Sequence, residues 1–324
     1  MKAIVIREPG GPDVLELRDV PDPEPVRGEV RVAVRASAVN RADVLQRMGA
    51  YPAPPGSPKD IPGLEYSGVV DALGEGVTDF AMGDRVFGIA GGGAYAEKIV
   101  LPARTVARMP ERLSFEEGAA VPEAFLTAYD AFVQAHLRPG ERVLVSACGS
   151  GVGTAAAQIA AALGARPFGT ARTREKIARA KTLGLTDGVV PENGRFADAV
   201  TKNFGAIDVV IELVGGAYVS EDLACLAPRG RIVLVGLVGG ASADVALGAL
   251  LQKRATIVGT VLRARPLEEK ILAARMLERE LAPLFTAGKL TPVIDRVLPL
   301  ARAREAHEAM QKNETFGKLV LKVQ

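Results

Sequence analysis

The chain has 324 residues, of which 48% are hydrophobic and 24% are charged, and its formal net charge is +2 at pH 7. This length suits two domains of ordinary size, and the average composition excludes a disordered chain or a coiled coil. The small net charge gives no sign of a nucleic-acid partner. The apolar stretch around Thr154–Leu163 is shorter than the roughly 20 residues that cross a bilayer, and the N-terminus shows no targeting pattern, so we expect a cytoplasmic protein.

Cysteine and histidine are too few for the common metal sites. The chain contains two cysteines, Cys148 and Cys225, and two histidines, His136 and His307, with no C-x₂-C or H-x₃-H spacing. A structural zinc site needs about four such ligands and a catalytic one about three. We therefore expect neither a zinc site nor a disulfide framework, and we expect both histidines to be structural residues of helical stretches, without partners.

The first 110 or so residues have the pattern of a β-rich domain. Gly and Pro clusters separate short alternating runs, and the stretch Gly49–Gly63, with five prolines, predicts an irregular loop. Ser114 and Glu117 form a capping-box pattern, and Pro122 suits the first turn of a helix over Glu123–Leu137. The predicted strands are Ala3–Ile6, Glu29–Ala38, Ser67–Ala72, Arg85–Ile89 and Ala94–Val100.

From Arg142 the pattern alternates between strand and helix, which predicts a doubly wound α/β sheet with both faces covered. After Arg263 we expect a long helix over Leu267–Phe285, a Pro-bounded strand, and a last strand, Lys318–Val323, that returns to the first domain. The predicted strands are Arg142–Ala147, Pro167–Ala171, Gly188–Val190, Asp208–Val214, Arg231–Leu237 and Thr256–Leu262. The predicted helices are Val152–Leu163, Thr173–Leu183, Phe196–Phe204, Ser220–Leu226 and Leu247–Lys253.

The segment Arg142–Leu163 predicts a phosphate-binding turn. A buried strand ends in the small-residue run CGSGVG, which starts a helix, so backbone N–H groups and the positive end of the helix dipole meet at one place. Gly149, Ser150 and Gly151 let phosphates approach the backbone, and Gly153 lets the helix lie close to the sheet. Compared with G-x-G-x-x-G the match is imperfect, because Cys148 and Ser150 replace the first two glycines. An ordinary tight turn is the alternative, and the second strand–helix unit that follows favours dinucleotide binding.

The end of that second unit distinguishes NADP from NAD. An NAD site usually carries Asp or Glu about here, for the ribose 2′-hydroxyl. This chain has Ala171, followed by Arg172, Thr173, Arg174 and Lys176. Cations and a hydroxyl beside a small residue favour a 2′-phosphate, so we predict NADPH, with contacts from Arg172 and Lys176. The alternative is a solvated basic helix face, to which we assign Arg179 and Lys181.

These segments resemble the medium-chain dehydrogenase/reductase superfamily, in its zinc-free quinone oxidoreductase branch (zeta-crystallin-like), and look closest to the type that animal cells induce through their tumour suppressor. The likeness spans nearly the whole chain and is carried by six motifs in family order. They are NRADVLQRMGAYPAPPG (Asn40–Gly56), IPGLEYSGVV (Ile61–Val70), AAVPEAFLTAYDA (Ala119–Ala131), SGVGTAAAQIA (Ser150–Ala160), DVVIELVGG (Asp208–Gly216) and FGKLVL (Phe316–Leu321). Zinc-dependent relatives carry a ligand Cys where Asn40–Asp43 stands and a ligand His where Leu64 stands, so the resemblance also implies a zinc-free enzyme.

The resemblance implies a GroES-like catalytic domain from residues 1–122 and 266–324, a Rossmann domain from residues 123–265, a cleft between them for the active site, and a homodimer formed through Thr256–Leu262. Pro191 stands where relatives often place a tyrosine against the 2′-phosphate. Asn40 and Tyr51 should face the nicotinamide, and we predict both as catalytic residues. The predicted cofactor-binding residues are Asn40, Tyr51, Thr127, Ser150, Gly151, Val152, Gly153, Arg172, Thr173, Lys176, Gly236, Leu237, Val261, Leu262, Arg263, Asn313 and Lys318.

Without a metal or a Ser/His/Asp arrangement, catalysis must rest on placing an acceptor against the nicotinamide. Asn40 and Tyr51 would donate hydrogen bonds to the acceptor oxygen, and whether Tyr51 also donates a proton stays open. Asp43 is either an active-site acid or, more commonly for such a residue, a helix cap or a partner of Arg41 or Arg47; Glu65 is expected to pair with a cation. The predicted function is an NADPH-dependent quinone oxidoreductase. The alternatives are an NADPH-dependent alkenal or enone reductase, and a non-catalytic, NADPH-binding RNA-binding or crystallin-like protein.

Overall fold

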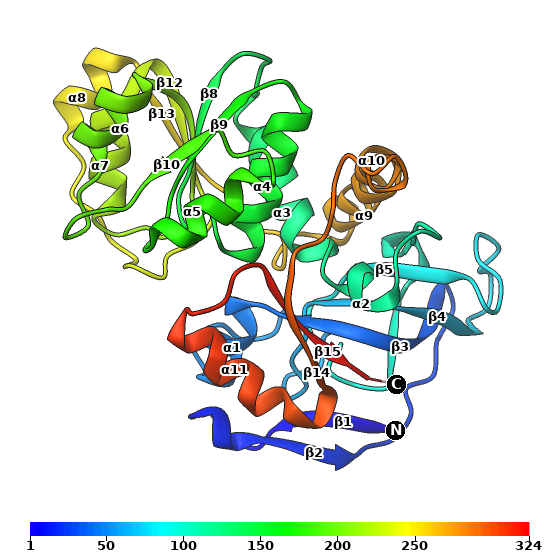
Figure 1. The fold of residues 1–324 in the computed structure, drawn as a ribbon. Coiled ribbons are helices and arrows are strands. Elements are labelled where there is room, and N and C mark those ends of the chain that lie inside the picture. The colour runs from blue at the N-terminus through cyan, green and yellow to red at the C-terminus, as the bar shows by residue number, and fades with distance from the viewer. Residues whose placement is uncertain (324) are drawn as a thin grey trace. The chain divides into compact units, whose positions relative to one another are not determined.

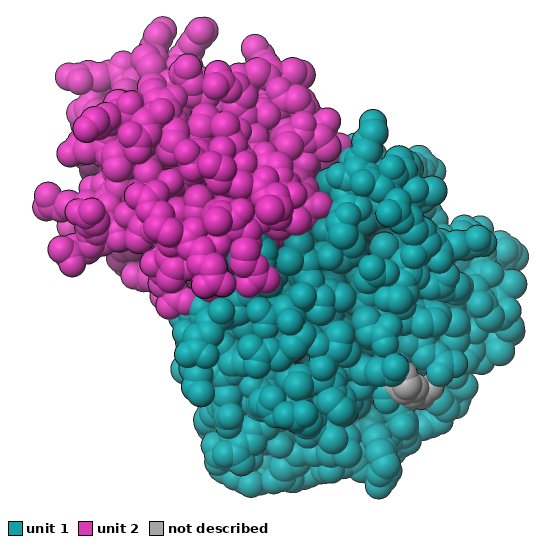
Figure 2. All heavy atoms as spheres, in the orientation of Figure 1, with its two compact units in different colours: residues 1–126, 262–324 teal, residues 127–261 magenta. Residues whose placement is uncertain are grey.

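The computed structural model describes residues 1–323, which form two compact units (Figure 2). Unit 1 comprises Met1–Leu126 together with the chain from Leu262 onward, and unit 2 is Thr127–Val261. The predicted boundaries, at 122/123 and 265/266, each lie a few residues away, and Gln324, which the predicted catalytic domain included, lies outside the described residues. The first boundary falls inside helix α3 (Pro122–Gln134).

Unit 1 is built on a seven-stranded sheet with the order β14-β15-β3-β4-β5-β7, in which β6 also pairs with β3. The pairs are antiparallel except β14 with β15. A separate hairpin joins β1 (Lys2–Ile6) and β2 (Leu15–Asp19). The strands of the sheet are β3 (Glu29–Val39), β4 (Glu65–Leu73), β5 (Arg85–Ile89), β6 (Lys98–Pro102), β7 (Ala107–Arg108), β14 (Ile294–Pro299) and β15 (Lys318–Lys322).

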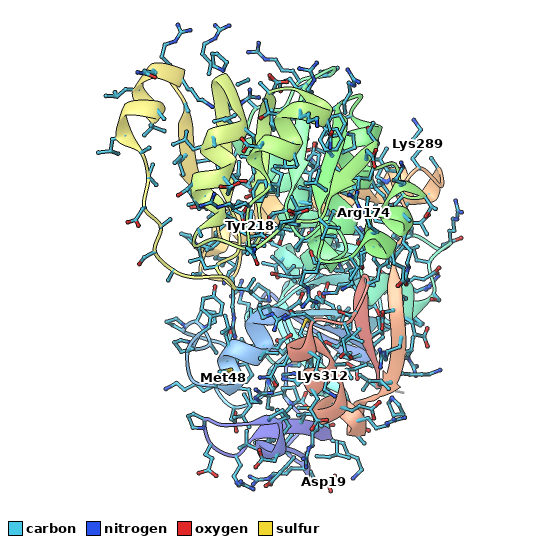
Figure 3. The ribbon with its side chains drawn as sticks, turned by 60° about the vertical axis from the view of Figure 1, so that its left-hand side comes forward. Asp19, Met48, Arg174, Tyr218, Lys289 and Lys312 are labelled. Carbon is cyan, nitrogen blue, oxygen red and sulfur yellow. The ribbon has the colours of Figure 1, made fainter. Side chains whose placement is uncertain are left out.

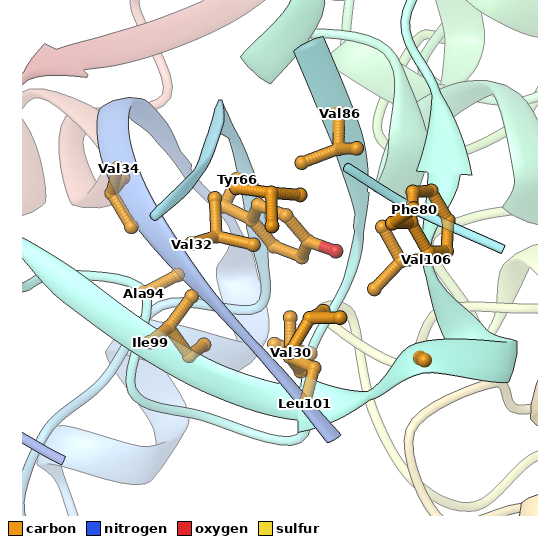
Figure 4. Close-up of a cluster of buried hydrophobic side chains, with 13 residues drawn as sticks. Val30, Val32, Val34, Tyr66, Phe80, Val86, Ala94, Ile99, Leu101 and Val106 are labelled. Carbon is orange, nitrogen blue, oxygen red and sulfur yellow. The ribbon is translucent and has the colours of Figure 1, made fainter. Parts of the chain in front are cut away.

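One core of unit 1 lies where β3, β4 and β5 turn their alternate side chains inward (Figure 4). Val30, Val32 and Val34 of β3 are fully buried there, which is the period-two pattern of a strand with one face on a core. Tyr66 packs among them, and burial raises the pKa of its hydroxyl well above its usual range. The cluster fixes the register of β3 and β4, and the ends of these strands carry Asn40 and Glu65.

The helices of unit 1 are α1 (Arg41–Arg47), α2 (Phe115–Ala119), α9 (Leu267–Met276), α10 (Ala282–Thr286) and α11 (Ala303–Lys312). The predicted capping box at Ser114 and Glu117 is confirmed at the start of α2. The long helix predicted at about Leu267–Phe285 is confirmed as an uninterrupted helical segment, in which one wide π-helical turn, Leu277–Leu281, lies between α9 and α10. There the N–H of Ala282 donates to the carbonyl of Leu277, five residues back, and the following Pro283 has no N–H to continue the α-helical ladder.

The strand predicted at Ala94–Val100 begins later, at Lys98. The backbone N–H groups of Ala94 and Tyr95 donate to Gly63 and Pro62 in the preceding loop, instead of to a strand. The irregular loop predicted over Gly49–Gly63 is confirmed. Its last residues are thereby held beside the start of β4.

Unit 2 is a parallel sheet of six strands with the order β10-β9-β8-β11-β12-β13, so the predicted doubly wound fold is confirmed (Figure 1). Ligands of such sheets bind beyond the carboxyl ends of the strands where the order reverses, here beside β8 and β11. The strands are β8 (Arg142–Val145), β9 (Arg166–Thr170), β10 (Asp187–Val189), β11 (Ile207–Glu212), β12 (Leu226–Leu234) and β13 (Thr256–Gly259). The helices are α4 (Gly151–Ala162), α5 (Arg174–Lys181), α6 (Ala197–Phe204), α7 (Tyr218–Cys225) and α8 (Leu247–Lys253).

The predicted return of the last strand is also confirmed. Strand β15 lies between β14 and β3, and Leu319–Lys322 pairs antiparallel with Ala36–Val39.

Among the described residues, no helix combines the length and the apolar character that crossing a membrane would require.

Candidate functional site

The predicted phosphate turn lies at the start of α4 in unit 2. Ser150 is the N-cap of this helix, and its hydroxyl accepts the N–H of Gly153 at 3.0 Å. The N–H groups of Gly151 and Val152, at the first two helical positions, have no partner among the described residues. Two free donors at the positive end of a 12-residue helix are suited to a pyrophosphate.

Gly153 is required by close packing. A Cβ at this position would lie 2.4 Å from the carbonyl oxygen of Ala147 and 2.8 Å from the Cα of Cys148, both backbone atoms that cannot move aside. Ala147 itself has a positive φ of 47°, which turns the chain sharply from β8 into α4. Gly153 was predicted to let the helix lie close to the sheet, and the close contacts here are with the two residues of the turn that follows β8.

The residues predicted to select NADPH follow β9 directly. Ala171 is buried, whereas Arg172 is exposed. Thr173 is the N-cap of α5, and its hydroxyl accepts the N–H of Lys176 at 3.3 Å, so this hydroxyl already has a structural partner. Burial raises the pKa of the Cys148 thiol to about 12, and the Lys176 ammonium opposes that rise, so Lys176 is within electrostatic range of this residue of the turn.

Arg172 lies toward α7. Burial raises the pKa of Tyr218, the first residue of α7, and the Arg172 guanidinium opposes that rise. Figure 3 labels Tyr218 and also Arg174, which is in the first turn of α5. Arg174 donates to the carbonyl of Gly188 in β10 at 3.5 Å. The two cations predicted to contact the extra phosphate thus lie within electrostatic range of the turn and of α7.

The backbone is also closely packed at the carboxyl end of β11. The Glu212 carboxylate accepts the N–H groups of Val214 and Gly215, the latter at 2.6 Å. A Cβ on Gly236 would meet the carbonyl oxygen of Leu213 at 2.4 Å. Of the other cofactor residues predicted in unit 2, Leu237 and Val261 are exposed and Thr127 is buried in α3. Free amide donors, glycine-only turns and two cations together fit a phosphorylated dinucleotide.

In unit 1, the centre of the predicted catalytic region is a buried ion pair. The ammonium nitrogen of Lys318 lies 2.6 Å from Oε1 of Glu65, and the two residues are 4% and 0% exposed. Lys318 also donates to Oδ1 of Asn40 at 2.6 Å and to the carbonyl of Val39 at 3.2 Å, so its three donors are all used. The cation expected beside Glu65 is therefore Lys318, which holds Asn40 and Glu65 in place.

Asn40 is engaged at both ends of its amide. Its Nδ2 donates to Oε1 of Glu65 at 2.8 Å and to the carbonyl of Ala38 at 3.3 Å. Both amide hydrogens thus have protein acceptors, which leaves little donor capacity for an acceptor oxygen. Direct contact of Asn40 and Lys318 with the cofactor stays a prediction.

The donor set at this place does not fit zinc. It consists of the Asn40 amide and one carboxylate, that of Glu65, which the Lys318 ammonium already neutralises. Within residues 1–323, no group of three or more His, Cys, Asp or Glu side chains is arranged to hold a metal ion. Thiolate or imidazole ligands, which zinc prefers, are absent from this cluster.

Asp43 caps α1, one of the roles considered from the sequence. Its carboxylate accepts the N–H groups of Asn40 at 2.8 Å and Gly63 at 3.0 Å, and the Tyr95 hydroxyl at 3.3 Å. Burial raises the pKa of Asp43 to about 7. The sequence reasoning missed Tyr95, because a lone aromatic carries no signal of a distant polar partner.

The expectation that the histidines have no partners is wrong for His307. Its Nε2 lies 3.3 Å from the Tyr95 hydroxyl and its Nδ1 lies 3.4 Å from Nη1 of the buried Arg47. Burial lowers the pKa of His307 to about 3, so the ring is neutral. His136 lies beyond the end of α3, with a φ of 48°, and not within a helix.

A groove of about 920 Å³ opens in unit 1. Its walls are mainly apolar, from the Pro-rich loop Pro54–Pro58, Gly91–Gly93 and Ile99, and its polar members include Glu123, Arg263 and Lys270. A space of this size, apolar with a few polar groups, is typical of small-molecule sites.

Arg263 ties the groove to Tyr51. Its guanidinium donates to the carbonyls of Gly91 at 2.8 Å and Tyr51 at 3.2 Å, and to the side chain of Gln46. It lies 5.1 Å from the centre of the Tyr51 ring, a cation–π contact. Two predicted residues, Tyr51 and Arg263, are thereby brought together. Gln46 and Glu123 were missed, because Gln46 stood only within the motif Asn40–Gly56 and Glu123 only at the start of a predicted helix.

Two further predicted cofactor residues lie elsewhere in unit 1. Leu262 is buried, and Asn313 ends α11 in a left-handed conformation and accepts a hydrogen bond from Arg41.

Comparisons with known proteins agree with this arrangement. Residues 26–111 match the family described as "Alcohol dehydrogenase GroES-like domain" and residues 151–278 match that described as "Zinc-binding dehydrogenase". Human quinone oxidoreductase is 35% identical over 99% of this chain and 97% of its own length. The quinone oxidoreductase of Thermus thermophilus, solved alone and with NADPH, is 36% identical over the full length of both chains, with a TM-score of 0.85.

A second solved structure shows what overall likeness leaves undecided. A protein described as an NAD-dependent alcohol dehydrogenase is also 36% identical, with a TM-score of 0.87 over the full length of both chains. Overall likeness alone therefore does not separate NAD from NADP. That choice depends on the local residues after β9, Ala171, Arg172 and Lys176.

Proposed function

Because the chain belongs to the zinc-free quinone oxidoreductase branch of the medium-chain dehydrogenase/reductase superfamily, we propose that it is an enzyme that reduces quinones with NADPH. The observation that carries the choice of cofactor is the residue set after β9, where Ala171 is buried and the Lys176 ammonium is within electrostatic range of Cys148 in the turn before α4. With Ala171 in place of a carboxylate, a 2′-phosphate would meet positive charge from Lys176 and Arg172 and no repulsion from position 171. A closer relation to the tumour-suppressor-inducible type stays a prediction.

The residues that would hold NADPH divide by the part of the cofactor they suit. The free amides of Gly151 and Val152 suit the pyrophosphate, and Arg172 and Lys176 suit the 2′-phosphate. When bound, NADPH supplies the hydride that reduces the acceptor. That Asn40 and Tyr51 face the nicotinamide stays a prediction from the family resemblance.

The protein's part in the reaction is to position the acceptor and to stabilise charge on its oxygen. The Tyr51 hydroxyl has no hydrogen-bond partner among residues 1–323, so it is available to donate a hydrogen bond. Asn40, with both hydrogens engaged, supports the site through Glu65 and Lys318. The apolar groove would exclude water from a flat ring and leave few polar contacts to satisfy.

The test is steady-state turnover of an ortho-quinone, a para-quinone and an alkenal, each with NADPH and with NADH. We expect quinone reduction with a clear preference for NADPH. Turnover of the alkenal alone, abolished in Tyr51→Phe, would favour the alkenal and enone reductase alternative. Tight RNA binding in a salt titration, with no turnover of any acceptor, would favour the non-catalytic alternative.

A homodimer through the last strand of unit 2 is also part of the proposal. Strand β13 pairs only with β12, at the edge of the sheet, and Leu247, Leu251 and Val261 near it in sequence are exposed. An unpaired edge beside apolar side chains suits pairing with a second copy across a two-fold axis. Sedimentation equilibrium of the protein and of Gly259→Pro would test it, because the N–H of Thr260 faces β12 and that of the preceding Gly259 therefore faces the open edge. The cytoplasmic location stays a prediction that cell fractionation can check.

A further inference from the structure

The groove in unit 1 contains an acidic side chain that has no part in the reaction as described so far. Glu123 lies in the first turn of α3, and its backbone N–H donates to Oε2 of Glu65 at 2.8 Å. Its own carboxyl group has no hydrogen bond or ion pair with any described residue, although its side chain is only partly exposed and lines the groove. A half-buried carboxyl without a partner is unusual, since buried polar groups are normally satisfied.

From this geometry we infer that Glu123 is the acid that protonates the reduced acceptor in the groove. The inference rests on the proposed function and adds a proton donor to it. An acid in this position must open onto the groove and be free of a competing internal partner. Glu123 meets both conditions.

The charges around Glu123 favour its protonated form. Glu65 of β4 and Asp43 of α1 both disfavour a further negative charge, while Lys318 of β15 and Arg263 favour one. Both cations already have other partners: Lys318 binds Glu65 and Asn40, and Arg263 binds backbone carbonyls and Gln46. Burial is the largest effect, and together these raise the pKa of Glu123 to about 8. Glu123 therefore carries a proton at neutral pH.

The chemistry balances without another co-reactant. A quinone that receives a hydride gains two electrons and one proton and becomes a hydroquinone anion. The O–H bond of Glu123 breaks, its proton goes to the anionic oxygen, and the electron pair stays on the Glu123 carboxylate. Arg263 and Lys318 then stabilise that carboxylate until it takes a proton from water in the groove. The sum is quinone plus NADPH plus one proton, giving hydroquinone and NADP⁺.

Glu123 suits this step better than Tyr51. Burial raises the pKa of the Tyr51 hydroxyl from its already high value, and this effect outweighs the opposing Arg263 guanidinium. General acids work best when their pKa lies near the working pH. A carboxyl group with a pKa of about 8 is thus the better donor at neutral pH, and Tyr51 keeps the role of a hydrogen-bond donor.

The test compares Glu123→Gln with Glu111→Gln, a matched change at an exposed site outside the groove. First, infrared titration of the protein without cofactor should show, besides the Asp43 carboxyl near pH 7, a carboxyl group that ionises near pH 8 in the parent and in Glu111→Gln and that is missing in Glu123→Gln. Second, kcat/KM for the quinone should fall above pH 8 in the parent. In Glu123→Gln it should be about 100-fold lower at pH 7 and flat with pH, since general acids contribute at least about this factor.

Two controls keep the outcome clear. The Kd for NADPH should be unchanged in Glu123→Gln, and Glu123→Asp should recover part of the rate, which also covers a failure of the glutamine variant to fold. Full quinone turnover by Glu123→Gln with the parent's pH profile, or no carboxyl group titrating near pH 8, would overturn the inference. Failure of the proposed function would look different, because the parent and Glu111→Gln would then both lack quinone turnover.

Discussion

The ammonium nitrogen of Lys318 lies 2.6 Å from a carboxylate oxygen of Glu65, with both side chains buried. The pair joins β15 to β4, two strands separated by most of the chain, and it also fixes the amide of Asn40. The Lys318 ammonium is therefore the counterion of the buried Glu65 carboxylate.

Lys318→Met should destabilise the protein strongly. Removing one partner leaves the Glu65 carboxylate buried without compensation, which costs about 3–5 kcal/mol. The double variant Lys318→Met/Glu65→Gln should recover most of that loss, because no buried charge remains. Urea unfolding would measure both. Lys322→Met, which breaks an exposed pair with Glu116, should cost at most about 1 kcal/mol, and an equal loss for Lys318→Met and Lys322→Met would contradict the prediction.

Gly153→Ala should impair NADPH binding. The new Cβ would lie 2.4 Å from the Ala147 carbonyl oxygen, so α4 must move away from the turn whose amides face the pyrophosphate. We expect the Kd for NADPH to rise about tenfold or more, equivalent to about 1.4 kcal/mol, in a fluorescence titration. Gly248→Ala in α8 is the control, because nothing lies within 4 Å of its Cβ position. It should leave the Kd unchanged and stabilise the helix by up to about 1 kcal/mol.

Reversing the charge of Lys176 should change the choice of cofactor. In Lys176→Glu the 2′-phosphate would lose a charge-assisted contact, worth about 1.5–3 kcal/mol, and would meet a carboxylate instead. The Kd for NADPH should rise at least about tenfold while that for NADH changes little. Arg179→Gln, in the last turn of the same helix, is the control and should bind both cofactors as the parent does. Equal weakening of NADPH and NADH in Lys176→Glu would contradict the electrostatic account.

His307 should make the protein less stable in acid. Burial lowers its pKa from 6.5 to about 3, so the unfolded chain takes up a proton more readily than the folded one. The stability due to the neutral ring is therefore fully present above pH 6.5 and is lost as the pH falls toward 3. The free energy of unfolding should fall less steeply over this range in His307→Gln than in the parent. His136→Gln, at an exposed site, should keep the parent's slope.

Much of unit 2 could be predicted from the sequence because its signals are local. The apolar run of β8, the small-residue turn and the cap at Ser150 follow one another in the chain, so the pattern determines the geometry directly. The same holds for Ser114 and Glu117 in unit 1. The basic cluster after β9 was likewise visible as a run of residues.

The missed features of unit 1 depend on residues far apart in the chain. Tyr95 and His307 meet across 212 positions, and Arg263 and Gln46 across 217. No periodicity or spacing records such a contact. Glu123 was missed for the same reason. An acidic residue is common in the first turn of a helix, and only the fold shows that Glu123 also lines the groove. The π-helical turn before Pro283 is a different case, because the proline is visible in the sequence but the wide turn was not predicted from it.

The place of β15 inside its sheet has a consequence for synthesis of the chain. Unit 2 is complete in the sequence at Val261, whereas the sheet of unit 1 still lacks the strand that separates β14 from β3. On the ribosome, the nucleotide-binding half of the nascent chain can thus acquire its structure while the other half waits for residues 318–322. Until Lys318 emerges from the exit tunnel, Glu65 has no counterion to be buried with.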